Sequence, residues 1–168
     1  MDNFDNHLPK RLLFSLKSNH PIVFIEWKQK TLFFSCSYSF YYTNGVEKGK
    51  PEFEDWRIFW NKINKLDVWN WKSSYCSKCD NCLDGLNWHL ELEYQDNFIS
   101  CCGKNCFPPA NSNRQSKIFV NLIEAFLELG TSIIDKKPEE DEAFKSNKKI
   151  GIDKEYEEDK IYKVEYNK

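Results

Sequence analysis

The fold is decided by one stretch of the chain, Leu86-Asn87-Trp88-His89-Leu90-Glu91-Leu92-Glu93-Tyr94. Its even-numbered residues are apolar or aromatic, and its odd-numbered residues are polar. Because successive side chains in a β-strand point to opposite faces, this alternation predicts a strand with one buried face. The following residues, Gln95-Asp96-Asn97, are typical of a turn, and residues 98–102 return as a second strand. The sequence therefore predicts an antiparallel hairpin.

The register of this hairpin follows if Tyr94 lies opposite Asn97. Cys101 then lies opposite Leu90 and points to the buried face. A shift of one residue would move every side chain of the strand to the other face, so the register can be tested residue by residue.

Further strands are expected upstream of the hairpin. Residues 12–16 form a short apolar run, and residues 21–27 and 30–40 are rich in β-branched and aromatic side chains. The connection between the last two stretches is only two residues long, which favours a hairpin. Residues 66–71, where Trp69 and Trp71 are two apart, predict another strand.

Two stretches have a helical period instead. In the first, aromatic and apolar residues recur at spacings of three and four, at Phe53, Trp56, Trp60 and Ile63. The second covers residues 118–129, and we expect it to end at Gly130, because glycine is common just after a helix.

This element order predicts an α+β fold, in which a mostly antiparallel sheet of about five or six strands has two helices packed on one face. We expect a single α+β domain over residues 1–134. Five tryptophans fit its core, although an aromatic cage for a base or a cation is an alternative; they are Trp56, Trp60, Trp69, Trp71 and Trp88.

Residues 135–168 have a different composition, with 9 Lys and 11 Asp or Glu among 34 residues. A segment this charged buries too little apolar surface to offset its ordering entropy. We therefore expect a charged C-terminal tail that is largely flexible. Residues 160–166 alternate charged with apolar or aromatic side chains, so the tail docking as an edge strand is the alternative.

Composition excludes several classes of protein. Aromatic residues make up 16% of the chain, which excludes a wholly disordered protein, and a net charge of -2 argues against a nucleic-acid partner bound through bulk positive charge. No apolar run approaches the ~20 residues of a membrane helix, and the first residues lack the apolar core of a signal peptide. The expected location is the cytoplasm, with reduced thiols and no membrane partner.

Six of the seven cysteines lie within residues 76–106. Three of them, Cys76, Cys79 and Cys82, have the spacing C-x2-C-x2-C, which suits tetrahedral zinc or an iron–sulfur cluster. Cys106 is the candidate fourth ligand, because extending the hairpin register places it beside Gly85, just after this loop. Zinc is thus the one cofactor that the sequence indicates.

Other interpretations of the cysteines are open. Cys102 lies opposite His89 on the outer face in the predicted register, and either residue can take the place of Cys106 as fourth ligand. Thiols that bind no metal, or that oxidise variably, explain the same sequence, because a buried free cysteine behaves as a small apolar residue.

A catalytic site is a further alternative. His89, Glu91 and Glu93 share one face of the predicted strand and carry the groups needed for acid–base chemistry. Cys102 with His89 is the one pair that the register supports for a cysteine nucleophile. The polar outer face of a sheet explains the same residues without any chemistry.

Several residues of this region also form a pattern. They are Trp69-Asn70-Trp71, Tyr75, Asp84-Gly85, Trp88-His89-Leu90-Glu91-Leu92 and Gly103-Lys104-Asn105-Cys106-Phe107-Pro108. The pattern resembles that of a family of small uncharacterised bacterial proteins, W-x-W, Y, D-G-x-x-W-x-L and G-x-N-x-[YF]-P. That family has no assigned activity, so the resemblance implies no catalytic residue. The cysteine loop between Tyr75 and Asp84 departs from the family pattern.

These observations favour a small non-enzymatic binding or interaction module. By analogy with short accessory proteins, it would bind or neutralise a protein partner or a small ligand in a bacterium or a mobile element. The alternatives are a zinc-stabilised interaction module that uses the loop of residues 76–82, and a small enzyme that uses His89.

Overall fold

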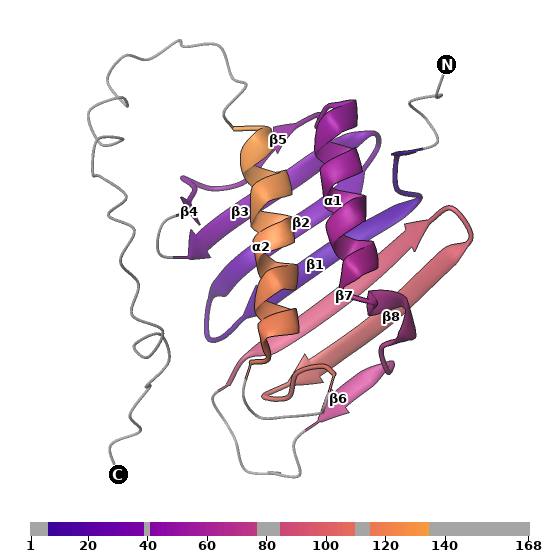
Figure 1. The fold of residues 1–168 in the computed structure, drawn as a ribbon. Helices are drawn as coiled ribbons and strands as arrows, with labels where there is room; N and C mark the ends of the chain where they lie inside the picture. Colours follow the sequence, from indigo (N-terminus) through magenta and orange to yellow (C-terminus); the bar gives the residue numbers. More distant parts are fainter. Residues whose placement is uncertain (1–6, 39–40, 77–84, 110–114, 135–168) are drawn as a thin grey trace, which may run out of the picture. The chain divides into compact units, whose positions relative to one another are not determined.

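Eight strands form one sheet in the computed structural model of the chain, which describes residues 7–38, 41–76, 85–109 and 115–134 (Figure 1). The strands are β1 (Arg11–Lys17), β2 (Pro21–Lys28), β3 (Thr31–Tyr38), β4 (Tyr41–Tyr42), β5 (Glu47–Gly49), β6 (Ser74–Cys76), β7 (Asn87–Tyr94) and β8 (Asn97–Lys104). They lie in the order β4-β3-β2-β1-β7-β8-β6, and β5 also pairs with β3. Only the pairing of β6 with β8 is parallel among the described strands.

The α+β class and the mostly antiparallel sheet are confirmed. The five long strands of the sheet correspond to predicted strands, and three short strands, β4, β5 and β6, bring the number above the expected five or six. The central hairpin has the predicted register, with Tyr94 opposite Asn97 and Cys101 opposite Leu90.

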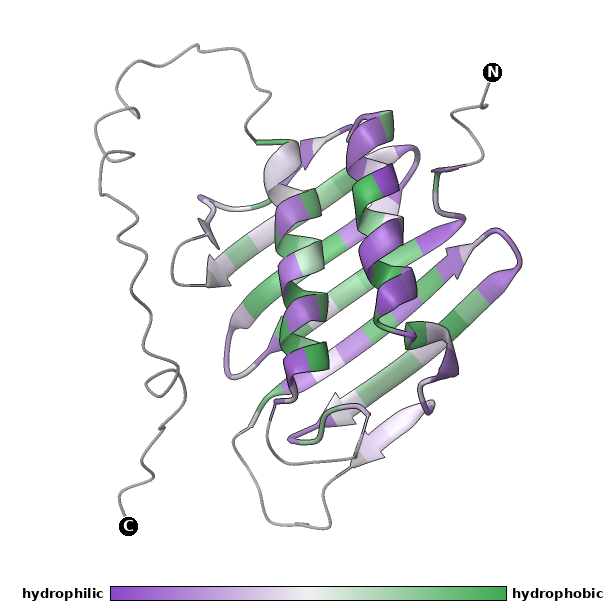
Figure 2. Cartoon of the chain, viewed as in Figure 1, coloured by the Kyte–Doolittle hydropathy of each residue, from purple (hydrophilic) through white to green (hydrophobic). Residues whose placement is uncertain are grey.

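Two helices, α1 (Phe53–Lys65) and α2 (Lys117–Ser132), lie next to each other on the same face of the sheet (Figure 1). Helix α1 begins with a capping box, in which the Glu52 backbone N–H donates to the Asp55 carboxylate over 2.7 Å. Trp56, Trp60 and Ile63 of the predicted stripe are buried. Hydrophilic residues follow the outer surfaces of both helices (Figure 2).

Helix α2 does not end at Gly130, as the sequence predicted, but continues to Ser132. A methyl group at Gly130 would lie 2.3 Å from a ring carbon of Phe34 on β3. Gly130 therefore allows a close approach of the helix to the sheet and does not terminate the helix.

The predicted strand over residues 66–71 is also wrong. This segment forms a short 3-10 helix, η2 (Val68–Asn70), which follows Asp67 in a left-handed conformation with φ 54°. Its tryptophans pack separately, because the ring of Trp69 stacks on Trp60 at 6.4 Å while Trp71 meets Trp88 edge-on at 6.5 Å. The two-residue spacing reflects these two contacts rather than a strand.

Aromatic side chains fill the space between the sheet and the helices. Trp60 stacks on Tyr94 of β7 with ring centroids 4.0 Å apart, and Phe14 of β1 stacks on Phe126 of α2 at 4.6 Å. The predicted tryptophan cluster joins this core: three of its members are buried, and the other two are partly buried against it.

Residues 135–168, predicted to form a charged tail, lie outside the described residues, so their flexible and edge-strand alternatives stay predictions. Within the described residues, none of the helices is long and apolar enough to cross a membrane.

Candidate functional site

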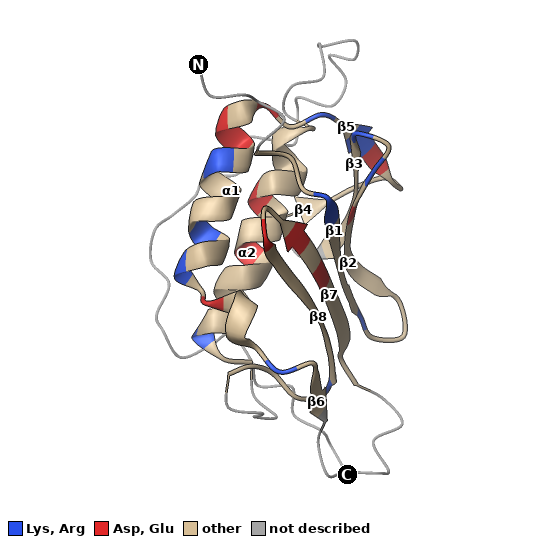
Figure 3. Cartoon of the chain, turned by 90° about the vertical axis from the view of Figure 1, so that its right-hand side faces the viewer, with Lys and Arg blue, Asp and Glu red and all other residues tan. Residues whose placement is uncertain are grey.

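The face of the sheet opposite the two helices carries four residues of the predicted sites, His89, Glu91, Glu93 and Cys102. An edge-on view places both helices on one side of the strands (Figure 3). We call the other side the open face. Its central side chains, read from the strand registers, are Leu13, Ser15, Phe24, Glu26, Phe33, Ser35, His89, Glu91, Glu93, Phe98, Ser100 and Cys102.

On β7 and β8 the open face is polar apart from Phe98, as the alternating sequence of β7 predicts. The Arg11 guanidinium of β1 lies 3.9 Å from the Glu91 carboxylate and 3.7 Å from that of Glu93. The same guanidinium carbon is 5.8 Å from the ring centroid of Phe98. Exposed ion pairs of this kind contribute little to stability, about 0–1 kcal/mol each. Their charged groups stay hydrated, so this half of the face is well suited to contact with water.

On β1, β2 and β3 the open face has a different character. Leu13, Phe24 and Phe33 point to it, although the residues on either side of each in its strand point into the core. We call these three side chains the apolar patch. The registers place Glu26 opposite both Leu13 and Phe33, and place Phe24 opposite Ser15 and Ser35. Glu26 therefore lies between two apolar side chains of the neighbouring strands, and Lys28 follows it on the same face of β2.

His89 and Cys102 lie opposite each other on the open face, as predicted. The Cys102 backbone N–H donates to Ser73 rather than to β7, which makes this a pair without mutual hydrogen bonds, the type in which side chains come closest. The His89 Nε2 is 3.6 Å from the Glu91 carboxylate, and the His89 side chain is 39% exposed. A thiol, an imidazole and a carboxylate are thus neighbours on an exposed surface.

Cys101 points into the core, as predicted from its position opposite Leu90. Burial raises the pKa of its thiol to about 12, and the neighbouring Cys102 adds to the shift. At neutral pH Cys101 is therefore a protonated, apolar core residue.

The predicted position of Cys106 beside Gly85 is wrong, because Asn105 takes that place. Asn105 turns the chain with φ 52°, its backbone N–H donates to the Leu86 carbonyl over 2.9 Å, and its side-chain oxygen accepts from the Leu86 N–H over 2.8 Å. Cys106 then lies 2% exposed, and its carbonyl accepts a 2.8 Å hydrogen bond from the Trp88 indole.

The structure describes only some of the predicted metal ligands. The Cys76 backbone pairs with Lys104 at the end of β8, two residues before Cys106, whereas Cys79 and Cys82 lie outside the described residues. Among the described residues, no three His, Cys, Asp or Glu side chains are grouped so that they could hold a metal ion. The zinc site, with Cys106, Cys102 or His89 as fourth ligand, stays a prediction.

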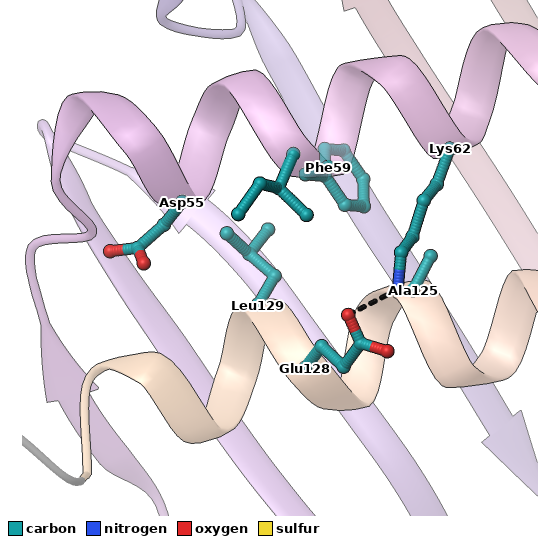
Figure 4. Close-up of a pocket in the computed structure, with 7 residues that line it drawn as sticks. Asp55, Phe59, Lys62, Ala125, Glu128 and Leu129 are labelled. Carbon is teal, nitrogen blue, oxygen red and sulfur yellow. Dashed lines mark hydrogen bonds and ion pairs between the residues drawn. The ribbon is translucent and has the colours of Figure 1, made fainter.

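A shallow hollow of about 140 Å³ lies in the seam between α1 and α2 (Figure 4). Its floor is apolar, and an ion pair between Lys62 and Glu128 crosses it. Asp55, at one end, accepts the capping hydrogen bond of α1. The charged groups of this hollow thus join and cap the helices, which gives no indication of a reaction.

The sequence did not indicate the apolar patch as a site, although consecutive apolar residues at Leu12-Leu13-Phe14 and Leu32-Phe33-Phe34 carry the signal. Neither the comparison with protein-family models nor the comparison with curated proteins found a match to this chain. The resemblance to a bacterial family is therefore untested, and the interpretation of the site rests on the geometry of the chain itself.

Proposed function

We propose that this chain is a non-enzymatic module that binds another protein, and that the open face over β1, β2 and β3 is its contact surface. One observation carries the proposal: Leu13, Phe24 and Phe33 are apolar at positions where β7 of the same sheet has polar residues. One half of the open face is thus suited to water, and the other half is suited to contact with apolar groups.

The contrast within the sheet indicates a missing cover. A sheet with one face in water alternates apolar and polar residues, whereas strands covered on both faces read as near-continuous apolar runs. Strand β7 follows the first pattern, and the centres of β1 and β3 follow the second. Among the described residues, the helices supply a cover on the other face only, and we infer that a partner covers the apolar patch.

The side chains of the open face indicate what kind of surface the partner presents. Interfaces between proteins combine an apolar centre with a polar rim. Here the patch supplies the centre, while Ser15, Ser35 and His89 begin the polar surround. Glu26, between Leu13 and Phe33, favours a partner that presents a flat apolar surface with an Arg or Lys side chain.

The proposal is tested by site-specific photo-crosslinking in the cells that make the protein. A photoreactive residue at Phe24 is expected to capture a distinct protein, while the same residue at Arg57, exposed on the outer side of α1, is the matched control. The captured protein is then purified, and its affinity is measured against the unmodified chain, Phe24→Thr and Arg57→Ala.

We expect Phe24→Thr to weaken binding at least about tenfold, since loss of a central aromatic contact commonly costs more than 1.4 kcal/mol. Arg57→Ala should leave the affinity within about twofold, because its side chain pairs only with its helix neighbour Glu54 among the described residues. An affinity unchanged by Phe24→Thr would refute the assignment of this surface.

A further inference from the structure

The outer edge of β8 has main-chain groups that point away from the sheet. The Asn105 N–H donates to Leu86 beside β7, over 2.9 Å, whereas the Cys102 N–H donates outward to Ser73, over 3.1 Å. Because these directions alternate along an antiparallel strand, odd-numbered residues of β8 bond to β7 and even-numbered residues point outward. The N–H and C=O groups of Phe98 and Ser100 therefore lie on the outer edge.

Within the part of the chain that the structure describes, nothing pairs with this section of β8. Strand β6 covers only residues 102–104. The nearby 3-10 helix η2 lies on the helix-covered side, because its Trp69 stacks on Trp60 and Trp60 stacks on Tyr94. Two donors and two acceptors of Phe98 and Ser100 are thus placed for pairing with one more strand.

This section also lacks the features that keep sheet edges apart. Natural proteins blunt exposed edges with charged residues, prolines, bulges or very short strands. Residues 97–101 contain neither a charge nor a proline, and β7 and β8 pair without a register shift. The opposite edge is protected, since β4 has two residues, and β5 has three and carries Lys48.

We infer that a second copy of the chain pairs with this edge, antiparallel and around a two-fold axis through Ile99. Phe98 of each copy then lies opposite Ser100 of the other, and each such pair exchanges two main-chain hydrogen bonds. Both helices of each copy lie on the same side of the joined sheet. The pairing ends at Cys102, whose N–H already donates to Ser73.

The edge of β8 is complementary to itself, which favours a second copy of the chain as the strand that pairs with it. The two-fold arrangement places no like charges opposite each other, because residues 97–101 are uncharged. It also brings Phe98, which is 55% exposed, opposite the small Ser100 side chain of the other copy. The contact involves few residues on each side, so the dimer is weak and depends on concentration.

Ser100→Pro tests the dimer. Proline removes the N–H of residue 100, which points away from β7, so the monomer loses no ladder hydrogen bond. Ser100→Thr is the matched control, because it keeps the N–H and favours a strand. Analytical ultracentrifugation of the full chain over a wide range of concentrations should give a monomer–dimer equilibrium for the unmodified chain and for Ser100→Thr, and a monomer at every concentration for Ser100→Pro.

Two further measurements keep the test decisive if Ser100→Pro does not fold. Phe98→Lys leaves the backbone unchanged and should also abolish the dimer, because it adds a charge to the edge. Hydrogen exchange should show protection of the Phe98 and Ser100 amides that rises with protein concentration. A chain that is monomeric at every concentration, a dimer that persists in both variants, or amide protection independent of concentration would each overturn the proposal.

Discussion

Gly130→Ala is expected to destabilise the protein, although the same change in most helices is stabilising. Alanine gains up to about 1 kcal/mol over glycine inside a helix. At this position the new methyl group would lie 2.3, 2.4 and 2.5 Å from three ring carbons of Phe34. Carbon atoms in favourable contact are about 3.5–4.0 Å apart, so the ring or the helix has to move by more than about 1 Å.

The magnitude follows from the packing around Phe34. Its side chain is completely buried in the centre of β3, and forcing extra volume into such a core costs about 1–3 kcal/mol. After the helical gain is subtracted, we expect a net loss of about 1–2 kcal/mol in the free energy of unfolding. Urea unfolding followed by tryptophan fluorescence measures this loss as a lower midpoint with an unchanged slope.

A double-mutant cycle identifies the cause. Phe34→Ala removes all three ring carbons that the methyl group would meet, so Gly130→Ala should cost less in that background than alone, and the two effects should not add. Gly130→Ala with the stability of the unmodified chain, or additive effects in the cycle, would show that Phe34 does not limit how closely α2 approaches the sheet.

Three other predictions concern the thiols and a helix cap. If the four predicted cysteine ligands bind zinc, protein purified without chelator should contain about one zinc per chain and lose thermal stability with chelator; less than about a tenth of an equivalent would contradict the site. The pKa of Cys101 is about 12 in the folded chain and near 9.0 unfolded, so its contribution to stability is complete below about pH 9 and is lost as the pH rises towards 12, by about 1.4 kcal/mol per pH unit. Cys101→Ala should lack this part of the decline in urea unfolding between about pH 8 and about pH 10, and an identical decline would refute the assignment. Ser116→Ala should cost about 1 kcal/mol, because the Ser116 hydroxyl accepts from the Phe119 N–H over 3.1 Å; Thr131→Ala near the other end of α2 is the control, and equal losses would contradict a specific cap.

Local pattern was sufficient for the parts of the fold in which one periodicity dominates. Strand β7 alternates without exception, and its two-residue turn fixes the register, so the positions of Cys101 and Cys102 could be predicted from the sequence. The aromatic stripe of α1 was equally clear, because its spacing matches one helical face.

The errors occur where contacts between distant segments decide the structure. Gly130 resembles a helix end in sequence, but its role depends on Phe34, nearly a hundred residues earlier. Cys106 departs from the extended register because Asn105 adopts a positive φ and closes the turn on Leu86. Neither contact leaves a periodic signal, so local pattern alone does not reveal them.

The apolar patch illustrates the same limit, and it also yields a direct test of whether it serves the fold or a partner. A consecutive apolar run predicts a strand covered on both faces, but only the position of the helices shows which face is left without a cover.

Phe14 and Phe24 lie on neighbouring strands and point to opposite faces of the sheet. Phe14→Thr should cost about 3–5 kcal/mol, as for other large core residues. Phe24→Thr should change the stability of the free chain by less than about 1 kcal/mol, because threonine suits a strand and Phe24 is only partly buried, on the face opposite the helices. Comparable losses from the two substitutions in urea unfolding would assign Phe24 to the fold and remove the reason for a partner at this face.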